Sequence, residues 1–318
     1  MNKSRSQGAR RIGFVGLGDM GGPIARRIAA AGFPLTVWAR RASAFSELGS
    51  ELYDVAASLA DLGRECDLVG LCVFGDDDVR QVAVGPDGLL SSMPPESVLL
   101  IHSTVSAELC FELASIAGER GVHVVDAPVS GARAAAVRGE LTIMLGGQRA
   151  LAPQVMPVLE TYGKVIRWMG PLGSGQITKA LNNVLGFGTG QLANLAIETG
   201  VALELDPHAL IDVLSTGSGG SFALNALVNV LMKDSQFAMH AAKMIEKDTH
   251  LFQRACRTHG VASTKLEEMA VARITHITPR IRLSDSKTVP LSGSGHDHSN
   301  RSGMDRHDAT IAADDPHG

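Results

Sequence analysis

The chain has 318 residues, 45% of them hydrophobic and 35 of them glycine, and a formal net charge of −4. This size and composition suit an α/β enzyme of one or two domains. Because the basic residues are dispersed, we expect neither a nucleic-acid partner nor binding to a membrane surface. The four cysteines have no CxxC or metal-ligand spacing, and neither a signal peptide nor a membrane helix is apparent. We therefore expect a cytoplasmic protein without a metal site.

A glycine-rich turn lies near the start of the chain, at residues 16–21. The apolar stretch at 11–15 predicts a buried strand before it, and the apolar spacing over 22–31 predicts a helix after it. Glycines in such a turn permit a tight bend, close approach to a pyrophosphate, and close packing of helix on strand. The helix N-terminus then presents free N–H groups to the phosphates. The predicted cofactor-binding residues of this turn are Gly16, Leu17, Gly18, Asp19, Met20 and Gly21.

Two arginines follow the next predicted strand, at 35–39, where an acidic residue would receive the ribose hydroxyls of NAD. The planar guanidinium groups of Arg40 and Arg41 suit a 2′-phosphate instead, because each can bind two phosphate oxygens. We therefore predict NADP as the preferred cofactor and NAD as the alternative. The competing interpretation is that one or both arginines are solvated turn residues.

Further strand patterns occur at 67–73, 98–102, 122–126, 141–145 and 165–169, separated by helical stretches, which predicts βαβ organisation. From 176 to about 203 the apolar residues have helical spacing, and further helical patterns occupy 207–214, 222–232, 239–258 and 265–277. The predicted fold is α/β: an N-terminal Rossmann-type dinucleotide-binding domain (11–174) joined through a long helix to an all-α domain (175–280). The polar composition of 284–318 predicts a disordered tail, whose histidines we expect to be solvated rather than metal ligands.

Several motifs in a fixed order make this chain resemble the β-hydroxyacid dehydrogenase family, which includes 3-hydroxyisobutyrate dehydrogenase and tartronate semialdehyde reductase. The resemblance covers roughly residues 11–277. The motifs are the glycine turn at 16–21 with Pro23 and Ala25, Ser103 with Thr104, DAPVSG at 126–131 with GELTIM at 139–144, GSGQITK at 173–179 with Asn182 and Asn183, and Lys247 with Asp248. Their combination is far more specific than any one of them.

The resemblance implies a catalytic lysine at Lys179 and a substrate-holding asparagine at Asn183, which helical spacing puts on one face. A charged lysine would donate a proton to the alkoxide formed during reduction, and a neutral one would accept the hydroxyl proton during oxidation. A buried site rich in cations would lower the pKa of this lysine towards the working range. A solvated helix lysine is the alternative.

The resemblance also implies that Ser130 and Gly131 receive the substrate carboxylate through a hydroxyl and backbone N–H groups. Ala132 follows where many members have a second glycine, so its methyl group would narrow the pocket or alter the loop. Further residues implied to contact the cofactor are Thr104, Lys247, and, at a loop where the sequence departs from the family, Val73 and Phe74. His102 is expected in the core, and contact with the nicotinamide pocket is the alternative.

The favoured hypothesis is an NADP-preferring oxidoreductase that interconverts a small β-hydroxy acid and its semialdehyde or oxo acid. An imine reductase of the same architecture is the second hypothesis, disfavoured because those proteins generally replace the lysine that this chain keeps at Lys179. A non-catalytic NADP-binding protein is the third, and the retained Lys179, Asn183 and Ser130 argue against it. The resemblance further implies a homodimer or homotetramer.

Overall fold

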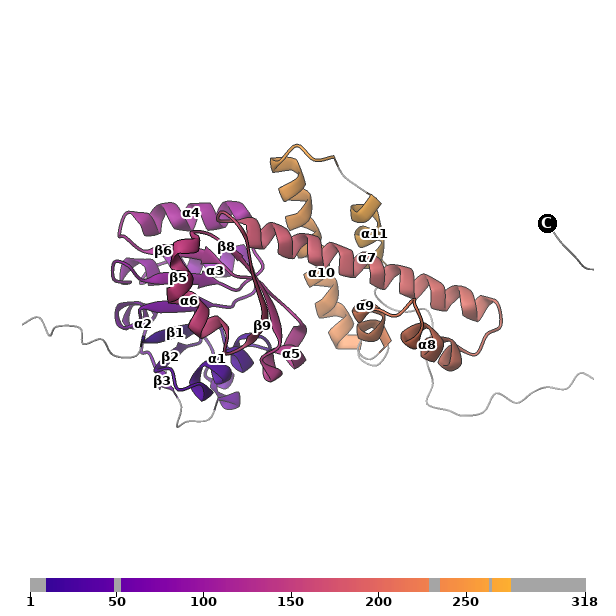
Figure 1. Cartoon of the computed structure of the whole chain (residues 1–318), viewed down its shortest axis with the longest axis horizontal. Coiled ribbons are helices and arrows are strands. Elements are labelled where there is room, and N and C mark those ends of the chain that lie inside the picture. Colours follow the sequence, from indigo (N-terminus) through magenta and orange to yellow (C-terminus); the bar gives the residue numbers. More distant parts are fainter. Residues whose placement is uncertain (1–9, 49–52, 229–234, 263–264, 276–318) are drawn as a thin grey trace, which may run out of the picture. The chain divides into compact units, whose positions relative to one another are not determined.

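The computed structural model describes residues 10–48, 53–228, 235–262 and 265–275 (Figure 1). Contacts between Cα atoms divide the chain into Met1–Leu283 and Ser284–Gly318, and all described residues belong to the first unit. The segment 284–318, predicted to be a disordered tail, lies outside the described residues, as does the end of the predicted all-α domain after 275.

The amino-terminal part is built on one sheet whose strand order is β3-β2-β1-β4-β5-β6-β8-β7, with β9 beside β8. Strands β1 to β6 pair in parallel, whereas β8 is antiparallel to β6 and β7. The strands are β1 (Ile12–Val15), β2 (Leu35–Trp38), β3 (Asp54–Val55), β4 (Leu68–Leu71), β5 (Val98–Ile101), β6 (His123–Asp126), β7 (Val129–Ser130), β8 (Leu141–Gly146) and β9 (Gly163–Gly170). The chain order reverses between β1 and β4, and open parallel sheets bind ligands at such a point, beyond the carboxyl ends of the strands.

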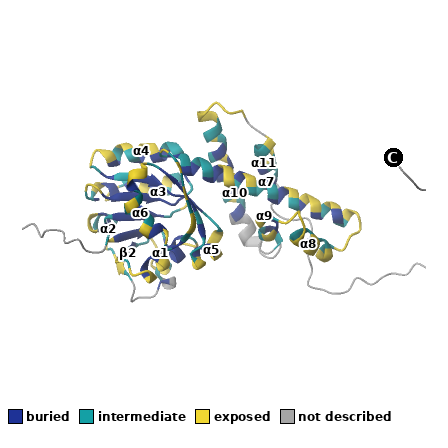
Figure 2. Cartoon of the chain, viewed as in Figure 1, coloured by how far each residue is buried: buried dark blue, intermediate teal, exposed yellow. Residues whose placement is uncertain are grey.

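Helices cover both faces of the sheet, so the central strands β1, β4 and β5 are buried along their whole length (Figure 2). Neighbouring residues of β1 show this: Phe14 belongs to one apolar cluster and Val15 to the other, and both are buried. The helices are α1 (Gly21–Ala30), α2 (Leu59–Glu65), α3 (Asp76–Val84), α4 (Ala107–Gly118), α5 (Ala132–Arg138) and α6 (Ala152–Leu159), with 3₁₀ turns η1 (Ala42–Glu47), η2 (Leu89–Ser91) and η3 (Arg149–Leu151).

The carboxyl-terminal part is helical, with α7 (Ser174–Ala202), α8 (Pro207–Thr216), α9 (Phe222–Ala226), α10 (Ser235–Thr258) and α11 (Lys265–Thr275). Helices α10 and α11 pack against α7 through Val184, Phe252 and Ala270, all at most 5% exposed. The predicted fold class, a Rossmann-type domain followed by a helical one, is confirmed. Along the described ranges, no helix is both long and apolar enough to cross a membrane.

The structure differs from the expected elements in detail. Strand β4 ends at Leu71 rather than at 73, because the Val73 N–H turns away from the sheet and donates to Ser103 Oγ over 2.8 Å. Strands β3 and β7 have two residues each, too few for a sequence pattern. Helix α9 ends at Ala226, and residues 229–232 of the helix expected at 222–232 lie outside the described residues.

Candidate active site

The glycine turn connects β1 to α1 and has the backbone that a dinucleotide site needs. Gly16 adopts a φ of 92°, and a Cβ there would lie 2.7 Å from the carbonyl carbon of Cys72. A Cβ at Gly21 would collide with the Gly16 carbonyl oxygen, so this glycine permits the helix to pack closely. By contrast, a Cβ at Gly18 would have no atom within 4 Å. Protein atoms therefore fill the space beside Gly16 and Gly21, whereas the space beside Gly18 is free.

The start of α1 is suited to an anion. Its N-cap residue, Met20, makes no capping hydrogen bond with its side chain, and the first turn contains no acidic residue. The amino-terminal turn of a helix has N–H groups without helical partners and a partial positive charge. Together with the open side at Gly18, these features fit a dinucleotide pyrophosphate, and Gly16 to Gly21 would hold it.

Both predicted phosphate-binding arginines are exposed beyond the end of β2. The Arg40 side chain is 73% exposed, and its Nη1 lies 3.7 Å from Asp78 Oδ1. An exposed ion pair of this kind contributes only about 0–1 kcal/mol, so a phosphate dianion can compete with Asp78 for the guanidinium. The position therefore fits a 2′-phosphate, and the part that Arg40 and Arg41 play stays a prediction.

Helix α7 places Lys179 in the interior, with 9% of the residue exposed. Burial lowers the pKa of its amine to about 8, the nearby Asp248 carboxylate opposes this shift, and Lys247 adds to it. The expected lowering is therefore present, although its main cause is burial and the site contains a carboxylate as well as a second cation. An amine with a pKa near 8 is populated in both proton states at neutral to mildly alkaline pH, as a general acid and base requires.

A chain of polar contacts links the substrate loop to α7 and α10. Asn182 Nδ2 donates to Ser130 Oγ over 3.3 Å and to Asn183 Oδ1 over 3.1 Å. Asn183 Nδ2 donates to Asp248 Oδ2 over 2.6 Å, and Lys247 Nζ donates to Asp248 Oδ1 over 2.7 Å. The structure thus brings three predicted site residues, Ser130, Asn183 and Lys247, into one network with Asp248 at its centre.

Lys247 also reaches the loops that follow β4 and β5. Its Nζ donates to the Thr104 carbonyl oxygen over 2.8 Å and lies 5.6 Å from the centre of the Phe74 ring. A lysine at this distance from an aromatic face is attracted by the ring. The predicted cofactor-contacting residues Thr104, Phe74 and Lys247 therefore lie together, although they come from three separate segments. Val73, the fourth, is tied to the same loop through Ser103.

The substrate loop has unusual backbone geometry at the departure from the family pattern. Gly131 has a φ of 128° and Ala132 a φ of 57°. A left-handed conformation costs a residue with a Cβ about 1–2 kcal/mol relative to glycine. Ala132 therefore adopts a strained backbone conformation that would suit glycine better. Its side chain is exposed.

His102 lies in the core, as expected. It is 2% exposed, its Nδ1 lies 2.8 Å from the Ala127 carbonyl oxygen, and its Nε2 lies 3.1 Å from the Tyr162 hydroxyl. Burial lowers the pKa of the imidazole to about 4, which keeps it neutral. The ring then donates from Nδ1 to the Ala127 carbonyl oxygen and accepts a hydrogen bond from the Tyr162 hydroxyl at Nε2, so both ring nitrogens have partners within the core.

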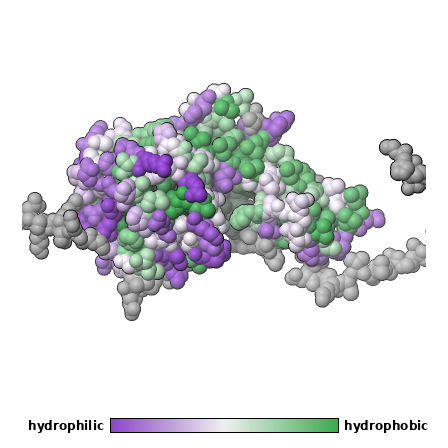
Figure 3. Space-filling model, in the orientation of Figure 1, coloured by the Kyte–Doolittle hydropathy of each residue, from purple (hydrophilic) through white to green (hydrophobic). Residues whose placement is uncertain are grey.

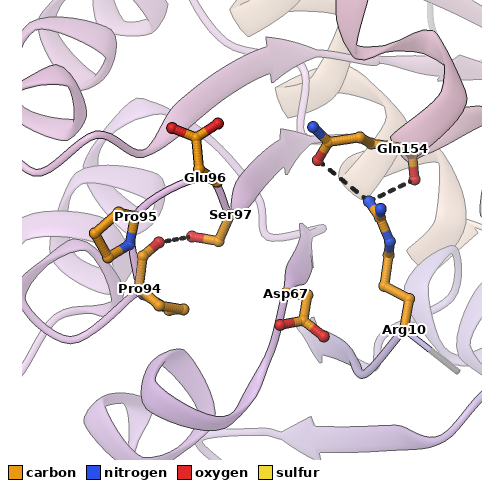
Figure 4. A pocket seen from close by; sticks show the side chains of 7 residues that line it. All are labelled: Arg10, Asp67, Pro94, Pro95, Glu96, Ser97 and Gln154. Carbon is orange, nitrogen blue, oxygen red and sulfur yellow. Dashed lines mark hydrogen bonds between the residues drawn. The ribbon is translucent and has the colours of Figure 1, made fainter. Parts of the chain in front are cut away.

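Two cavities lie away from these residues. The more polar one, of about 340 Å³, is lined by Arg10, Asp67, Pro94, Pro95, Glu96, Ser97 and Gln154 (Figure 4). Asp67 and Ser97 directly precede β4 and β5, so this hollow lies at the amino ends of strands. Figure 4 shows Arg10 turned to Gln154, to which it donates over 3.0 and 3.3 Å. The other, of about 590 Å³, lies beside α4 and η3.

Besides Asn182, Asp248 is a residue of this network that the sequence did not place in the site. It is 6% exposed and accepts hydrogen bonds from both Asn183 and Lys247. The sequence signal was its position beside Lys247 in a motif of the family, to which no role for Asp248 was attached. Its contact with Asn183 joins residues 65 apart in the chain and carries no local pattern.

Comparisons with known proteins find matches for both parts of the chain. Residues 11–170 match the NAD binding domain of 6-phosphogluconate dehydrogenase, and residues 173–275 match the NAD-binding domain of NADP-dependent 3-hydroxyisobutyrate dehydrogenase. An NAD-dependent L-serine dehydrogenase of Pseudomonas aeruginosa is 31% identical over 83% of this chain and 90% of its own length. A 3-hydroxyisobutyrate dehydrogenase of the same organism is 34% identical over 67% of this chain and 72% of its own.

Solved structures show the same fold. The 3-hydroxyisobutyrate dehydrogenase of Mycobacterium tuberculosis, solved with L-serine, has a TM-score of 0.73 at 24% identity over 86% of this chain and 97% of its own. The chain belongs to the β-hydroxyacid dehydrogenase family. It is thus an NAD(P)-dependent oxidoreductase of the 3-hydroxyacid dehydrogenase class.

Proposed function

We propose that this protein is an NADP-preferring enzyme that interconverts a small β-hydroxy acid and its semialdehyde or oxo acid, with Lys179 as general acid and base. The observation that carries the proposal is the burial of Lys179 one helical turn from Asn183, beside Asp248 and Lys247. A solvated helix lysine would be neither buried nor close to the charges of Asp248 and Lys247. NADP(H), when bound at residues 16–21, supplies or accepts the hydride.

The chain's own residues divide the remaining work. Ser130, with the backbone of Gly131 and Ala132, binds the substrate carboxylate, for which a hydroxyl and N–H groups are suited. Asn183, fixed by its donation to Asp248, orients the reacting oxygen towards the amine of Lys179. Lys179 accepts the hydroxyl proton during oxidation and returns it to the forming alkoxide during reduction.

The substrate class follows from this loop and from the relatives. A site with one hydroxyl and one loop of N–H donors suits a small carboxylate. L-serine and 3-hydroxyisobutyrate are the substrates in the names of two relatives. Both compounds carry their hydroxyl group on the β-carbon, next to the carbon that bears the carboxylate. We extend this chemistry to the present chain and include the semialdehydes as the reverse substrates.

The test is a substrate panel followed by the absorbance of the reduced nicotinamide. Purified protein is mixed with NADP⁺ and small β-hydroxy acids, and separately with NADPH and semialdehydes, glyoxylate or cyclic imines. We expect turnover with a β-hydroxy acid or its semialdehyde. Turnover with imines alone would favour an imine reductase, and tight NADPH binding without turnover on any compound would favour a binding protein.

The arginine pair should decide between the two nicotinamide cofactors. Replacing Arg40 and Arg41 with alanine removes two cations beside the expected 2′-phosphate, so we expect NADPH binding to weaken by about 10- to 100-fold, equivalent to one or two charge-assisted hydrogen bonds. NADH binding should change by less than about threefold, because NADH has no phosphate there. Fluorescence titration with both cofactors measures this. An Arg120→Ala variant, in the exposed turn after α4, serves as the matched control. Equal weakening for both cofactors would contradict the assignment.

A homodimer or homotetramer is also part of the proposal, and an exposed apolar face on α7 supports it. Four leucines at helical spacing, Leu181, Leu185, Leu192 and Leu195, are 41–60% exposed. Figure 3 shows hydrophobic surface over the helical part of the chain. Contiguous exposed apolar side chains mark interaction surfaces.

Light scattering on the purified protein should therefore give at least twice the chain mass. Glutamate at both Leu185 and Leu192 should shift it to one chain mass, because burying two carboxylates at an apolar contact is strongly unfavourable. The control is Val55→Glu, which adds one carboxylate at a 57% exposed position on β3. A monomeric parent would overturn the oligomer, and an unaltered mass in the double variant would exclude this face.

We further propose that the cofactor-binding domain spans 11–174 and the helical domain 175–280. The two family matches, at 11–170 and 173–275, support a boundary at the start of α7.

A further inference from the structure

A buried carboxylate that the proposed mechanism does not use lies at the end of β6. Asp126 is fully buried, and its two oxygens accept hydrogen bonds from the start of α7: Oδ1 from the Gly173 N–H over 2.7 Å and Oδ2 from the Gln176 N–H over 2.8 Å. Burial raises the pKa of this carboxyl, and the backbone N–H groups of Gly173 and Gln176 oppose that rise. The helix thus has no capping side chain of its own and takes its cap from a strand about 50 residues earlier.

The surroundings of Asp126 are shaped for this contact. A Cβ added at Gly146 would collide with its carboxylate, and one added at Gly175 would lie 2.7 Å from Oδ2. Gly146 is the residue that pairs with Asp126 across the sheet. Two positions without side chains therefore give the carboxylate its space, one on β8 and one in the first turn of α7.

Gln176 makes a second set of contacts between the start of α7 and the sheet domain. It is 2% exposed, its Nε2 donates to the Ser103 carbonyl oxygen over 2.9 Å, and its Oε1 accepts from the Val105 N–H over 3.1 Å. These two groups flank Thr104, whose carbonyl oxygen receives Lys247. One buried amide therefore ties α7 to the loop that is expected to contact the cofactor.

Lys179 follows Gln176 by three residues, which is about 4.5 Å along the axis and nearly the same face of the helix. The position of its amine therefore depends on the rotation and axial placement of the first turn of α7. We propose that Asp126 and Gln176 are positioning residues that fix this turn against the ends of β5 and β6 and so hold Lys179 at the reacting oxygen. The inference rests on the proposed role of Lys179.

The test uses substitutions that keep side-chain volume. Gln176→Met removes both amide hydrogen bonds, and we expect kcat to fall by about 10- to 100-fold, the loss associated with a catalytic group displaced by about 1 Å. The affinity for NADPH, from fluorescence titration, should stay within about threefold. Gln191→Met is the matched control, because Gln191 is also buried on α7 at 2% exposure but lies four turns beyond Gln176. Its kcat should stay within about twofold of the parent value.

The decisive measurement repeats Gln176→Met in a Lys179→Ala background. If Gln176 acts through the lysine, the residual turnover should then change by less than about twofold, whereas a general structural role predicts the same loss in both backgrounds. Asp126→Asn, which places an N–H₂ group against a backbone N–H, should show the same non-additivity, and circular dichroism checks that each variant folds.

Three results would overturn the inference: parental kcat in Gln176→Met, equal losses in both backgrounds, or a loss of NADPH affinity as large as the loss of kcat. The last result would mean that the amide of Gln176 positions the cofactor-contacting loop around Thr104 and not Lys179. An inactive Lys179→Ala protein beside a fully active Gln176→Met protein defeats the positioning role and leaves the proposed function standing. Parental activity in Lys179→Ala defeats both.

Discussion

Replacing Lys179 with alanine is expected to lower kcat by about 10²- to 10⁴-fold, the usual contribution of a positioned general acid and base. The amine is buried beside Asp248, so no solvent group replaces it easily. NADPH binding should stay within about twofold, because the contacts predicted for the cofactor lie on other elements. Steady-state kinetics and fluorescence titration measure the two quantities. The control is Lys243→Ala, which removes an exposed lysine of α10 and should leave both unchanged.

The Lys179→Ala variant also tests whether this lysine causes the pH dependence of kcat/KM. With a pKa of about 8, the amine must be neutral for oxidation, so kcat/KM for the hydroxy acid should rise with pH and level off above about 8. For reduction the amine must be charged, so kcat/KM should be level below that pH and fall above it. Lys179→Ala should lose this inflection from its residual activity. An inflection that survives in the variant would assign the titration to another group and contradict the role of Lys179.

Alanine at Gly18 and alanine at Gly16 should have opposite consequences. Gly18→Ala should fold normally, because its methyl group meets no atom within 4 Å, yet it should weaken NADPH binding by at least about tenfold by occupying the space of the pyrophosphate. Gly16→Ala should lower the free energy of unfolding by about 2–4 kcal/mol, since the residue adopts a φ of 92° and its methyl group meets the Cys72 carbonyl.

Thermal unfolding and cofactor titration distinguish the two variants. Gly118→Ala is the control, because a Cβ there also meets nothing within 4 Å and the residue ends α4 away from the turn. A Gly18→Ala protein that binds NADPH as tightly as the parent would show that the pyrophosphate does not approach this glycine. A Gly16→Ala protein with parental stability would show that the turn relaxes more easily than its geometry implies.

Sequence patterns predicted those elements whose formation depends on residues close together in the chain. The strand before residue 16 and the helix after 21 follow from apolar spacing, and the long helix follows from a proline-free stretch. The glycine turn was predictable because its requirement for glycine is local to the backbone. The two-residue strand β7 was not, since its pairing with β8 depends on a segment more than ten residues away.

The candidate site was less accessible to sequence reasoning. Lys179 and Asn183 were placed on one helix face by spacing alone, yet the contact of Asn183 with Asp248 required the packing of α10 on α7. The hydrogen bonds of Asp126 and Gln176 likewise join residues that are 50 and 73 positions apart. At Ala132 the resemblance indicated a departure from glycine, and only the structure revealed that the backbone kept the left-handed conformation. The assigned roles of these residues stay predictions.

The two lysines and the aspartate of the site also determine how its electric charge behaves during a turnover. Lys179, Lys247 and Asp248 lie together in a largely buried region, where a change in net charge is costly. During oxidation Lys179 would gain one positive charge with the hydroxyl proton, and this gain would offset the positive charge that bound NADP⁺ would lose by accepting the hydride. The substrate gives up a hydride and a proton and keeps its own charge. The total is therefore the same before and after reaction, so the low-polarity interior favours neither direction through charge alone.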